Sequence, residues 1–180
     1  VPKQAAWQKL ILAHSPYLAA NLGIGAGDPP TAAFAAALAE AKAGAGRATD
    51  TAQLMAILRR AKKKIAAITG IADLKGEWDD LTVMRRLSEF ADFAVREALA
   101  HLLGAAHARK IIRLPAPKQP LKDCGVAVIA LGKWGAFELN YSSDIDLMIL
   151  FDPRRSPVKA SEETQNFFIR LARDLARLLD

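Results

Sequence analysis

The stretch VAVIALGKWGAFELNYSSDIDLMILF, residues 126–151, holds two apolar segments joined by a connection that carries glycines and serines. The first segment, 126–131, is short and partly β-branched, as expected of a buried strand. The second, 145–151, is apolar at successive positions, so we expect a central strand covered on both faces and ended by Pro153. Between them, KWGAFELN (133–140) is long enough for about two helical turns. The order predicted here is strand–helix–strand.

Helices are predicted before this stretch. Ser15, which precedes a proline, can cap one helix, and Thr31 can cap the next. A third helix is expected over 51–69, ended by Gly70. The clearest helix is expected over 82–108, where apolar residues recur at helical spacing.

A linker and a last helix complete the predicted order. LPAPKQPLKDCG carries three prolines, which indicates a linker over 114–124. Ser161 can cap a final helix, whose predicted apolar side is formed by Phe168, Leu171, Leu175 and Leu178. The expected fold class is therefore α+β, with a helical region over 1–113 and strand–helix–strand–helix over 125–180.

Composition narrows the class of protein. The 180 residues are 52% hydrophobic with a formal net charge of +6, which is ordinary for a globular protein. A single cysteine, Cys124, excludes an internal disulfide and fits a cytoplasmic location. No apolar run approaches the roughly 20 residues of a membrane span, so no membrane association is expected.

We interpret the basic run 58–64 as a solvated helix face; contact with phosphate or RNA is the alternative, and a nucleic-acid partner is not expected. The chain begins without methionine and stops within an amphipathic pattern, as part of a longer polypeptide would.

Common nucleotide-binding and metal-binding templates do not fit. Between Gly125 and Gly132 there are six residues where a P-loop has four, and Trp134 replaces the required Ser or Thr. No G-x-G-x-x-G occurs, which argues against a dinucleotide site. The three histidines show no metal-ligand spacing.

Two aspartates, Asp144 and Asp146, fit a different kind of site. Residues i and i+2 of a strand point to the same face, roughly 6.6 Å apart. Carboxylates so placed can hold two divalent ions for in-line phosphoryl transfer, and Mg²⁺ suits such oxygen ligands. Ile145 and Leu147 would pack beneath them. These two acids are the predicted catalytic and metal-binding residues, and a third acid is expected after residue 180.

Neighbouring residues extend this site toward phosphate. Gly132 lets the backbone turn tightly and approach a ligand closely. Lys133 adds a positive charge, while Ser142 and Ser143 offer hydroxyls and backbone N–H groups that can hold phosphate. The alternative is that these serines and aspartates only end a helix and cap a turn.

The stretch resembles the nucleotidyltransferase superfamily of DNA polymerase β. That pattern is a hydrophobic residue, Gly, a second small residue and, about a dozen residues later, Asp-hydrophobic-Asp-hydrophobic. Leu131-Gly132 and residues 144–147 fit it, so the resemblance implies the first part of a polymerase-β-like domain. Lys133 departs from the second small residue, and its phosphate-contacting role would pass to Ser142 and Ser143.

The resemblance to one family is closer. GKWGAFELNYSSDIDL (132–147) is similar to the signature G-K-x-G-x-x-E-L-N-x-x-S-D-I-D-L of the bifunctional glutamine synthetase adenylyltransferase/adenylyl-removing enzyme. The helical segments LRRAKKKIAAITGIADL (58–74) and LSEFADFAVREAL (87–99) also resemble the N-terminal region of that family. The resemblance therefore covers most of the chain.

This resemblance implies a two-domain enzyme. One domain removes AMP from an adenylylated tyrosine of glutamine synthetase by phosphorolysis, giving ADP; the other adds AMP from ATP. Asn140 favours the removing domain, since the adding copy tends to read Glu-Leu-Gly. The implied substrates are phosphate and an adenylyl nucleotide, the implied partners glutamine synthetase and the PII signal protein. Glu138 and Asn140 are expected to support the Ser-Ser-Asp turn.

Three alternative functions remain: the adding domain of the same family, another polymerase-β-like enzyme acting on RNA or a small molecule, and a docking module without chemistry. Without the third acid, the fragment alone is expected to be inactive.

Overall fold

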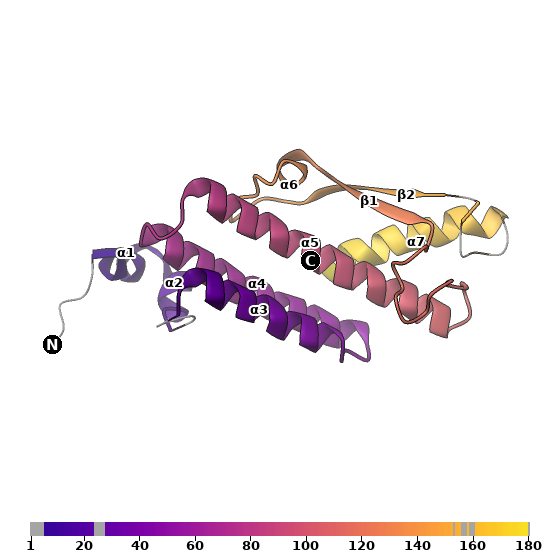
Figure 1. Cartoon of the computed structure of the whole chain (residues 1–180), viewed down its shortest axis with the longest axis horizontal. Coiled ribbons are helices and arrows are strands. Elements are labelled where there is room, and N and C mark those ends of the chain that lie inside the picture. The colour runs from indigo at the N-terminus through magenta and orange to yellow at the C-terminus, as the bar shows by residue number, and fades with distance from the viewer. Residues whose placement is uncertain (1–5, 24–27, 153, 156–157, 159–160, 180) are drawn as a thin grey trace.

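The computed structural model describes residues 6–23, 28–152, 154–155, 158 and 161–179. It combines helices with a small antiparallel sheet, which confirms the α+β class (Figure 1). The elements in chain order are α1 (Ala6–His14), α2 (Pro16–Ala20), α3 (Pro30–Ala45), α4 (Thr51–Leu74), α5 (Asp80–Ala108), β1 (Val126–Leu131), α6 (Gly132–Gly135), β2 (Asp146–Phe151) and α7 (Ser161–Leu179).

Helices α3 and α4 pack side by side, and the long helix α5 lies between them and the sheet (Figure 1). The largest core cluster forms where α4, α5 and α7 meet, and the apolar stripe of each helix faces it. Leu54, Leu103 and Leu175 are almost fully buried there. This one core contains residues of the helical region and of the sheet; the predicted division at 113 and 124 stays a prediction.

The observed helix starts agree with the predicted ones only in part. Ser15 caps α2 as predicted, because its Oγ accepts a hydrogen bond from the Leu18 N–H at 3.2 Å. The prediction that Thr31 caps the next helix is wrong: α3 begins at Pro30, after Pro29, and its first turn has no side-chain cap. A proline at the first helical position already has a fixed φ and lacks the N–H that a cap would satisfy.

The helix expected to end at Gly70 continues to Leu74. Gly70 lies inside α4, where a Cβ would stand only 3.2 Å from Leu18 Cδ2. The glycine therefore makes room for the leucine of α2 and does not end the helix. The intrinsic helical cost of glycine, about 1 kcal/mol relative to alanine, is tolerated because this packing needs the space.

Strands β1 and β2 pair antiparallel, with Leu131 opposite Asp146 and Val126 opposite Phe151. The expectation that the second strand is covered on both faces is wrong. Exposure alternates along both strands, so that one face packs on α5 and α7 and the other is open. The open face consists of Ala127, Ile129, Leu131, Asp146, Met148 and Leu150.

Helix α7 covers part of the inner sheet face. Its Phe168 stacks on Phe151 of β2, with ring centroids 4.4 Å apart. The predicted apolar side of this helix is confirmed: Phe168, Leu171, Leu175 and Leu178 are all buried. Pro153 as the end of the strand and the side chain of Ser161 as a cap lie outside what the structure describes. Among the described helices, none has the length and apolar character needed to cross a membrane.

Candidate functional site

The two candidate metal-binding carboxylates lie where the chain enters β2. Asp146 is the first residue of this strand, and Asp144 precedes it by two positions. Both are exposed, while Ile145 between them is half-buried and packs, as predicted for it and for Leu147, against the cluster on α5. The alternation of exposure therefore continues back through Asp144, and the two carboxylates belong to the open face of the sheet.

Gly132, directly after β1, contacts Asp146. It has a φ of +55°, and a Cβ placed on it would lie 2.9 Å from Asp146 Oδ2. The sheet register explains this proximity, because Leu131 is paired with Asp146. The left-handed backbone favours glycine here, and a side chain at this position would displace the exposed Asp146 carboxylate.

Helix α6 is a single turn, where the sequence predicted about two turns over 133–140. A Schellman motif ends it: the Phe137 N–H donates to Trp134 O at 3.0 Å and the Glu138 N–H to Lys133 O at 2.7 Å. Phe137 takes the left-handed position of this motif, with φ of +60°. Glycine usually fills that position, so the local sequence gave no stop signal. Glu138 takes part in the turn through its backbone, and the side chains of Lys133 and Glu138 are exposed.

Trp134 fastens α6 to α5. Its ring is buried against Ala91 and Val95 of α5, and its Nε1–H donates a hydrogen bond to Asp92 Oδ1 at 2.9 Å. Leu139 adds a second anchor, because its N–H donates to the Oγ of the fully buried Ser88 at 3.3 Å. The connection between the strands is thus held at both ends by the long helix beneath it.

Asn140 organises the serine turn that follows, residues 140–143, called here the site loop. Its Oδ1 accepts hydrogen bonds from the Ser142 N–H at 3.3 Å and from the Ser143 hydroxyl at 2.7 Å. The Asn140 N–H donates in return to Ser143 Oγ at 3.2 Å. The Ser143 hydroxyl is therefore engaged within the loop. The Ser142 hydroxyl forms no hydrogen bond with any described residue and is exposed, so it is the serine hydroxyl better placed to meet a ligand.

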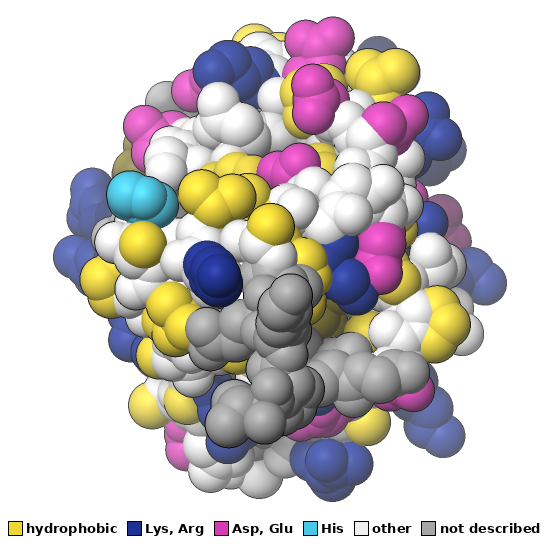
Figure 2. Space-filling model, turned by 90° about the vertical axis from the view of Figure 1, so that its left-hand side faces the viewer, with side chains coloured by type: hydrophobic (Ala, Val, Ile, Leu, Met, Phe, Trp, Pro, Cys, Tyr) yellow, Lys and Arg dark blue, Asp and Glu magenta, His cyan; other side chains and the backbone are white. Residues whose placement is uncertain are grey.

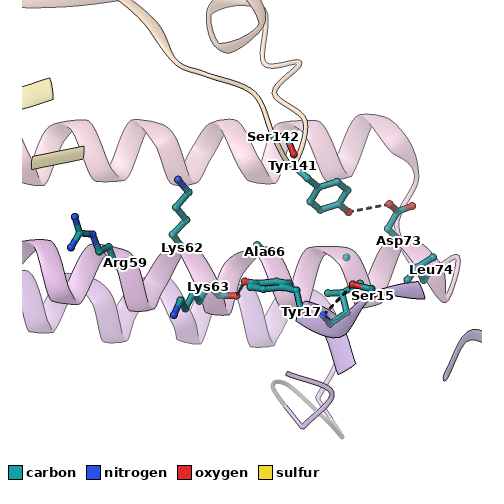
Figure 3. A pocket seen from close by; sticks show the side chains of 12 residues that line it. Ser15, Tyr17, Arg59, Lys62, Lys63, Ala66, Asp73, Leu74, Tyr141 and Ser142 are labelled. Atoms are coloured by element: carbon teal, nitrogen blue, oxygen red, sulfur yellow. Dashed lines mark hydrogen bonds between the residues drawn. The ribbon is translucent and has the colours of Figure 1, made fainter. Parts of the chain in front are cut away.

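Tyr141 ties the site loop to the end of α4. Its hydroxyl donates a hydrogen bond to Asp73 Oδ2 at 3.0 Å, across 68 positions of sequence (Figure 3). Burial and the nearby Asp73 carboxylate raise the pKa of the Tyr141 hydroxyl above its ordinary value of 10.0. The hydroxyl is consequently a neutral donor at ordinary pH.

The site has the donor chemistry of a magnesium site but only part of a ligand set. Asp144 and Asp146 offer carboxylate oxygens, which Mg²⁺ prefers, on an accessible face. In the described part of the chain, no group of three or more Asp, Glu, His or Cys side chains is gathered as metal ligands are. The two acids could supply two oxygen ligands to a Mg²⁺ ion.

Several residues that hold this site were not predicted from the sequence: Trp134, Asp92, Ser88, Tyr141 and Asp73. Large aromatic residues within an otherwise polar connection were the available signal for Trp134 and Tyr141. Their acidic partners lie on helices far away in sequence, and no local pattern marks them. The end of the molecule that carries the α4–α5 turn shows several acidic side chains in its upper part (Figure 2).

Comparison with known proteins gives a consistent result. The model of a family described as glutamate-ammonia ligase adenylyltransferase matches residues 4–180. A protein of Bradyrhizobium diazoefficiens is 41% identical over 152 residues, or 84% of this chain. Proteins of Xanthobacter autotrophicus, 40% identical over 84% of the chain, and Rhizobium meliloti, 41% identical over 75%, are also similar. All three are described as bifunctional glutamine synthetase adenylyltransferase/adenylyl-removing enzymes.

The chain is short beside these relatives. The matched part spans 15% of the Bradyrhizobium and Xanthobacter proteins and 14% of the Rhizobium protein. Similarity thus extends over most of the chain and over a small part of each relative.

Proposed function

The chain belongs to the glutamate-ammonia ligase adenylyltransferase family, and from this premise we propose that it carries the first part of a nucleotidyl-transfer site. The proposed reaction removes AMP from an adenylylated tyrosine of glutamine synthetase. An oxygen of inorganic phosphate attacks the adenylyl phosphorus in line. The bond from phosphorus to the tyrosine oxygen breaks, and that oxygen takes up a proton. The products are ADP and the unmodified tyrosine.

The contact between Asp146 and Gly132 is the observation that carries this proposal. It sets a carboxylate against the backbone of the turn that begins α6, on the open face of the sheet. A phosphate held at this turn and a cation held by the carboxylate would be neighbours.

Each residue of the site has a proposed role. Asp144 and Asp146 would bind Mg²⁺, which when bound supplies positive charge to offset that of the reacting phosphates. The exposed Ser142 hydroxyl would donate a hydrogen bond to a phosphate oxygen, and Lys133 would attract the anionic substrates. Ser143 and Asn140 would hold the loop in shape. A third acid and the residues that bind adenine are expected to come from the polypeptide after residue 180.

Asn140 supports removal of AMP over its addition. Its side chain accepts two of the hydrogen bonds that shape the site loop. Glycine, which the adding copy tends to carry here, has no side chain to do so. The preference for removal therefore rests on the family signature, and the hydrogen bonds show what the asparagine does in this chain.

The test uses the longer enzyme that contains this segment, with Asp144→Asn and Asp146→Asn together. We expect phosphate-dependent release of ADP from adenylylated glutamine synthetase to be lost, while ATP-dependent addition continues. A matched control is Asp152→Asn, since Asp152 follows the opposite end of β2. Loss of addition with retention of removal would instead assign this segment to adding AMP. Retention of both activities would refute a catalytic role for the two acids.

Glutamine synthetase is the proposed partner because the reaction acts on it. Contact with the PII protein remains a prediction from family resemblance, as does a cytoplasmic location. The proposal concerns this segment as part of a longer enzyme, for which two acids alone form an incomplete metal site.

A further inference from the structure

A groove of about 730 Å³ lies between α4, α2 and the site loop (Figure 3). Its size is within the range of about 300–1,000 Å³ that is usual for small-molecule sites. Tyr17 and Leu18 of α2 form one side, and Tyr141 and Ser142 of the site loop form another. Neither Asp144 nor Asp146 is among the described residues that line it, so the groove is separate from the two carboxylates.

The floor of the groove is one face of α4. The residues that line it recur every three or four positions, from Arg59 to Leu74, as residues on one side of a helix do. Along the helix axis, the groove has two parts that differ in charge. Its first part carries the cations Arg59, Lys62 and Lys63, and its second part begins at Ala66 and ends near Asp73.

The cations at the first end lack acidic partners. Among the residues that the structure describes, none of Arg59, Lys62 and Lys63 forms an ion pair, whereas the adjacent Lys64 pairs with Glu40 at 2.7 Å. In Figure 3, Lys62 projects from α4 toward the side on which Ser142 and Tyr141 lie. Three unpaired positive charges at one end of a groove favour an anionic ligand group, and phosphate is the group best suited to them.

The other end suits a flat ring. Tyr141 brings an aromatic side chain to it, Tyr17 reaches from it to Lys63 of the first part, and Ala66 and Leu18 add apolar surface. Both tyrosine hydroxyls are engaged, since Tyr17 donates to Lys63 O at 2.7 Å and Tyr141 to Asp73 Oδ2 at 3.0 Å. The rings are thereby fixed in place. The second carboxylate oxygen of Asp73 has no hydrogen bond from a described residue and can accept one from an amino group.

We propose that this groove binds a nucleoside phosphate, with its phosphates at Arg59 and Lys62 and its base between the tyrosines and Asp73. The separation of eleven positions from Lys62 to Asp73 corresponds to about 16 Å along the helix axis. That length suits an extended ligand with a charged end and a ring at the other. A free acidic peptide would use the cations but would leave the tyrosine rings and the Asp73 carboxylate without a matching group.

Such a ligand would contact the proposed transfer site through one residue. Ser142 lines the groove and also belongs to the loop that leads into Asp144. Occupancy of the groove would therefore restrain the site loop. This inference goes beyond the transfer reaction, and binding can be measured whether or not the two aspartates are catalytic.

The experiment titrates the 180-residue chain with ADP by calorimetry, in EDTA so that no divalent cation occupies Asp144 and Asp146. We expect one saturable ADP site. Arg59→Gln and Lys62→Gln should each weaken binding by about tenfold, the scale of one lost charge-assisted hydrogen bond. Adenosine and inorganic phosphate, which each fill only one end, should bind far more weakly than ADP.

Two controls make the result specific. Arg60→Gln removes the same charge from the same helix, but Arg60 lines a different groove beside Glu40 and should change binding less than twofold. The pair Asp144→Asn and Asp146→Asn should leave ADP binding unchanged. Absence of saturable binding, equal weakening by Arg60→Gln, or loss of binding in the double aspartate variant would each overturn the proposal. The last result would place the nucleotide at the carboxylates themselves, and circular dichroism would confirm that every variant is folded.

Discussion

The Nε1–H of Trp134 donates a hydrogen bond to Asp92 Oδ1 at 2.9 Å, joining the single-turn helix α6 to the long helix α5. The indole is also 4% exposed, so the bond and the buried ring act together. Helix α6 begins at Gly132, which contacts Asp146. The hydrogen bond between Trp134 and Asp92 therefore also fixes the position of this turn relative to the sheet. The turn beside a candidate metal ligand is thus held by a tryptophan that packs against α5.

The first prediction concerns this anchor. Trp134→Phe keeps most of the buried area but removes the donor, and we expect it to lower the free energy of unfolding by about 1–3 kcal/mol. Asp92→Ala should cost a similar amount, because it removes the acceptor of the same bond. Urea denaturation of both variants and of the double variant measures the coupling, and Leu10→Ala, at an exposed position of α1, serves as a control. Additive effects of the two changes would show that the bond contributes nothing.

The second prediction separates backbone strain from the contact with the carboxylate. Gly76 and Gly132 both have positive φ, but a Cβ at Gly76 would meet nothing within 4 Å, while at Gly132 it would lie 2.9 Å from Asp146 Oδ2. Gly76→Ala should therefore cost only the left-handed backbone penalty of about 1–2 kcal/mol. Gly132→Ala should cost at least as much in unfolding free energy and also displace Asp146.

The readout for that displacement is activity of the longer enzyme. Misplacing a reacting group by about 1 Å can reduce a rate on the order of 100-fold, so Gly132→Ala should lower phosphate-dependent ADP release far more than Gly76→Ala. Equal activities in the two variants would show that the position of Asp146 against Gly132 has no role in the reaction.

Parts of this fold follow directly from sequence pattern. The strands 126–131 and 145–151 could be placed within one residue, because short apolar segments with β-branched residues have few other stable forms. That one face would stay open could not be predicted. Nearly every side chain in both strands is apolar, so the usual alternation between apolar and polar positions is absent.

Tertiary contacts explain the other differences. Gly70 has the local signal of a helix end, but Leu18 packs into the space above it and the helix continues. Phe137 has no stop signal, yet it takes the left-handed position that ends α6. The two acids of the candidate site could be proposed from their spacing together with the upstream glycine and the adjoining serines, whereas the anchors of the site loop depend on partners up to 68 positions away.

The third prediction concerns Asn140 and the site loop. Asn140→Gly removes the acceptor for the Ser142 N–H and the Ser143 hydroxyl, and we expect ADP release by the longer enzyme to fall by about tenfold as the loop loses its shape. Asn140→Asp keeps an oxygen at the same place and should restore most of the activity. If glycine and aspartate variants are equally impaired, the amide acts in some other way than by accepting these bonds.

The fourth prediction uses the raised pKa of Tyr141. Burial and the Asp73 carboxylate hold the proton on the folded tyrosine, while the unfolded chain releases it near the ordinary value of 10.0. Below that pH both states are protonated, so the contribution of this tyrosine to stability is fully present. As pH rises above it, the unfolded state loses its proton first, and the contribution falls.

The measurement compares the native chain with Tyr141→Phe, by urea denaturation, at intervals from about pH 7 to pH 11. We expect the native chain to be the more stable at neutral pH, by about 0.5–1.5 kcal/mol for the lost hydrogen bond. This difference should shrink above about pH 10, and the decrease should be smaller in an Asp73→Asn background, where the carboxylate that raises the pKa is gone. A difference that stays constant up to about pH 11 would contradict the raised pKa of Tyr141, and an equal decrease in the Asp73→Asn background would contradict the contribution of Asp73 to it.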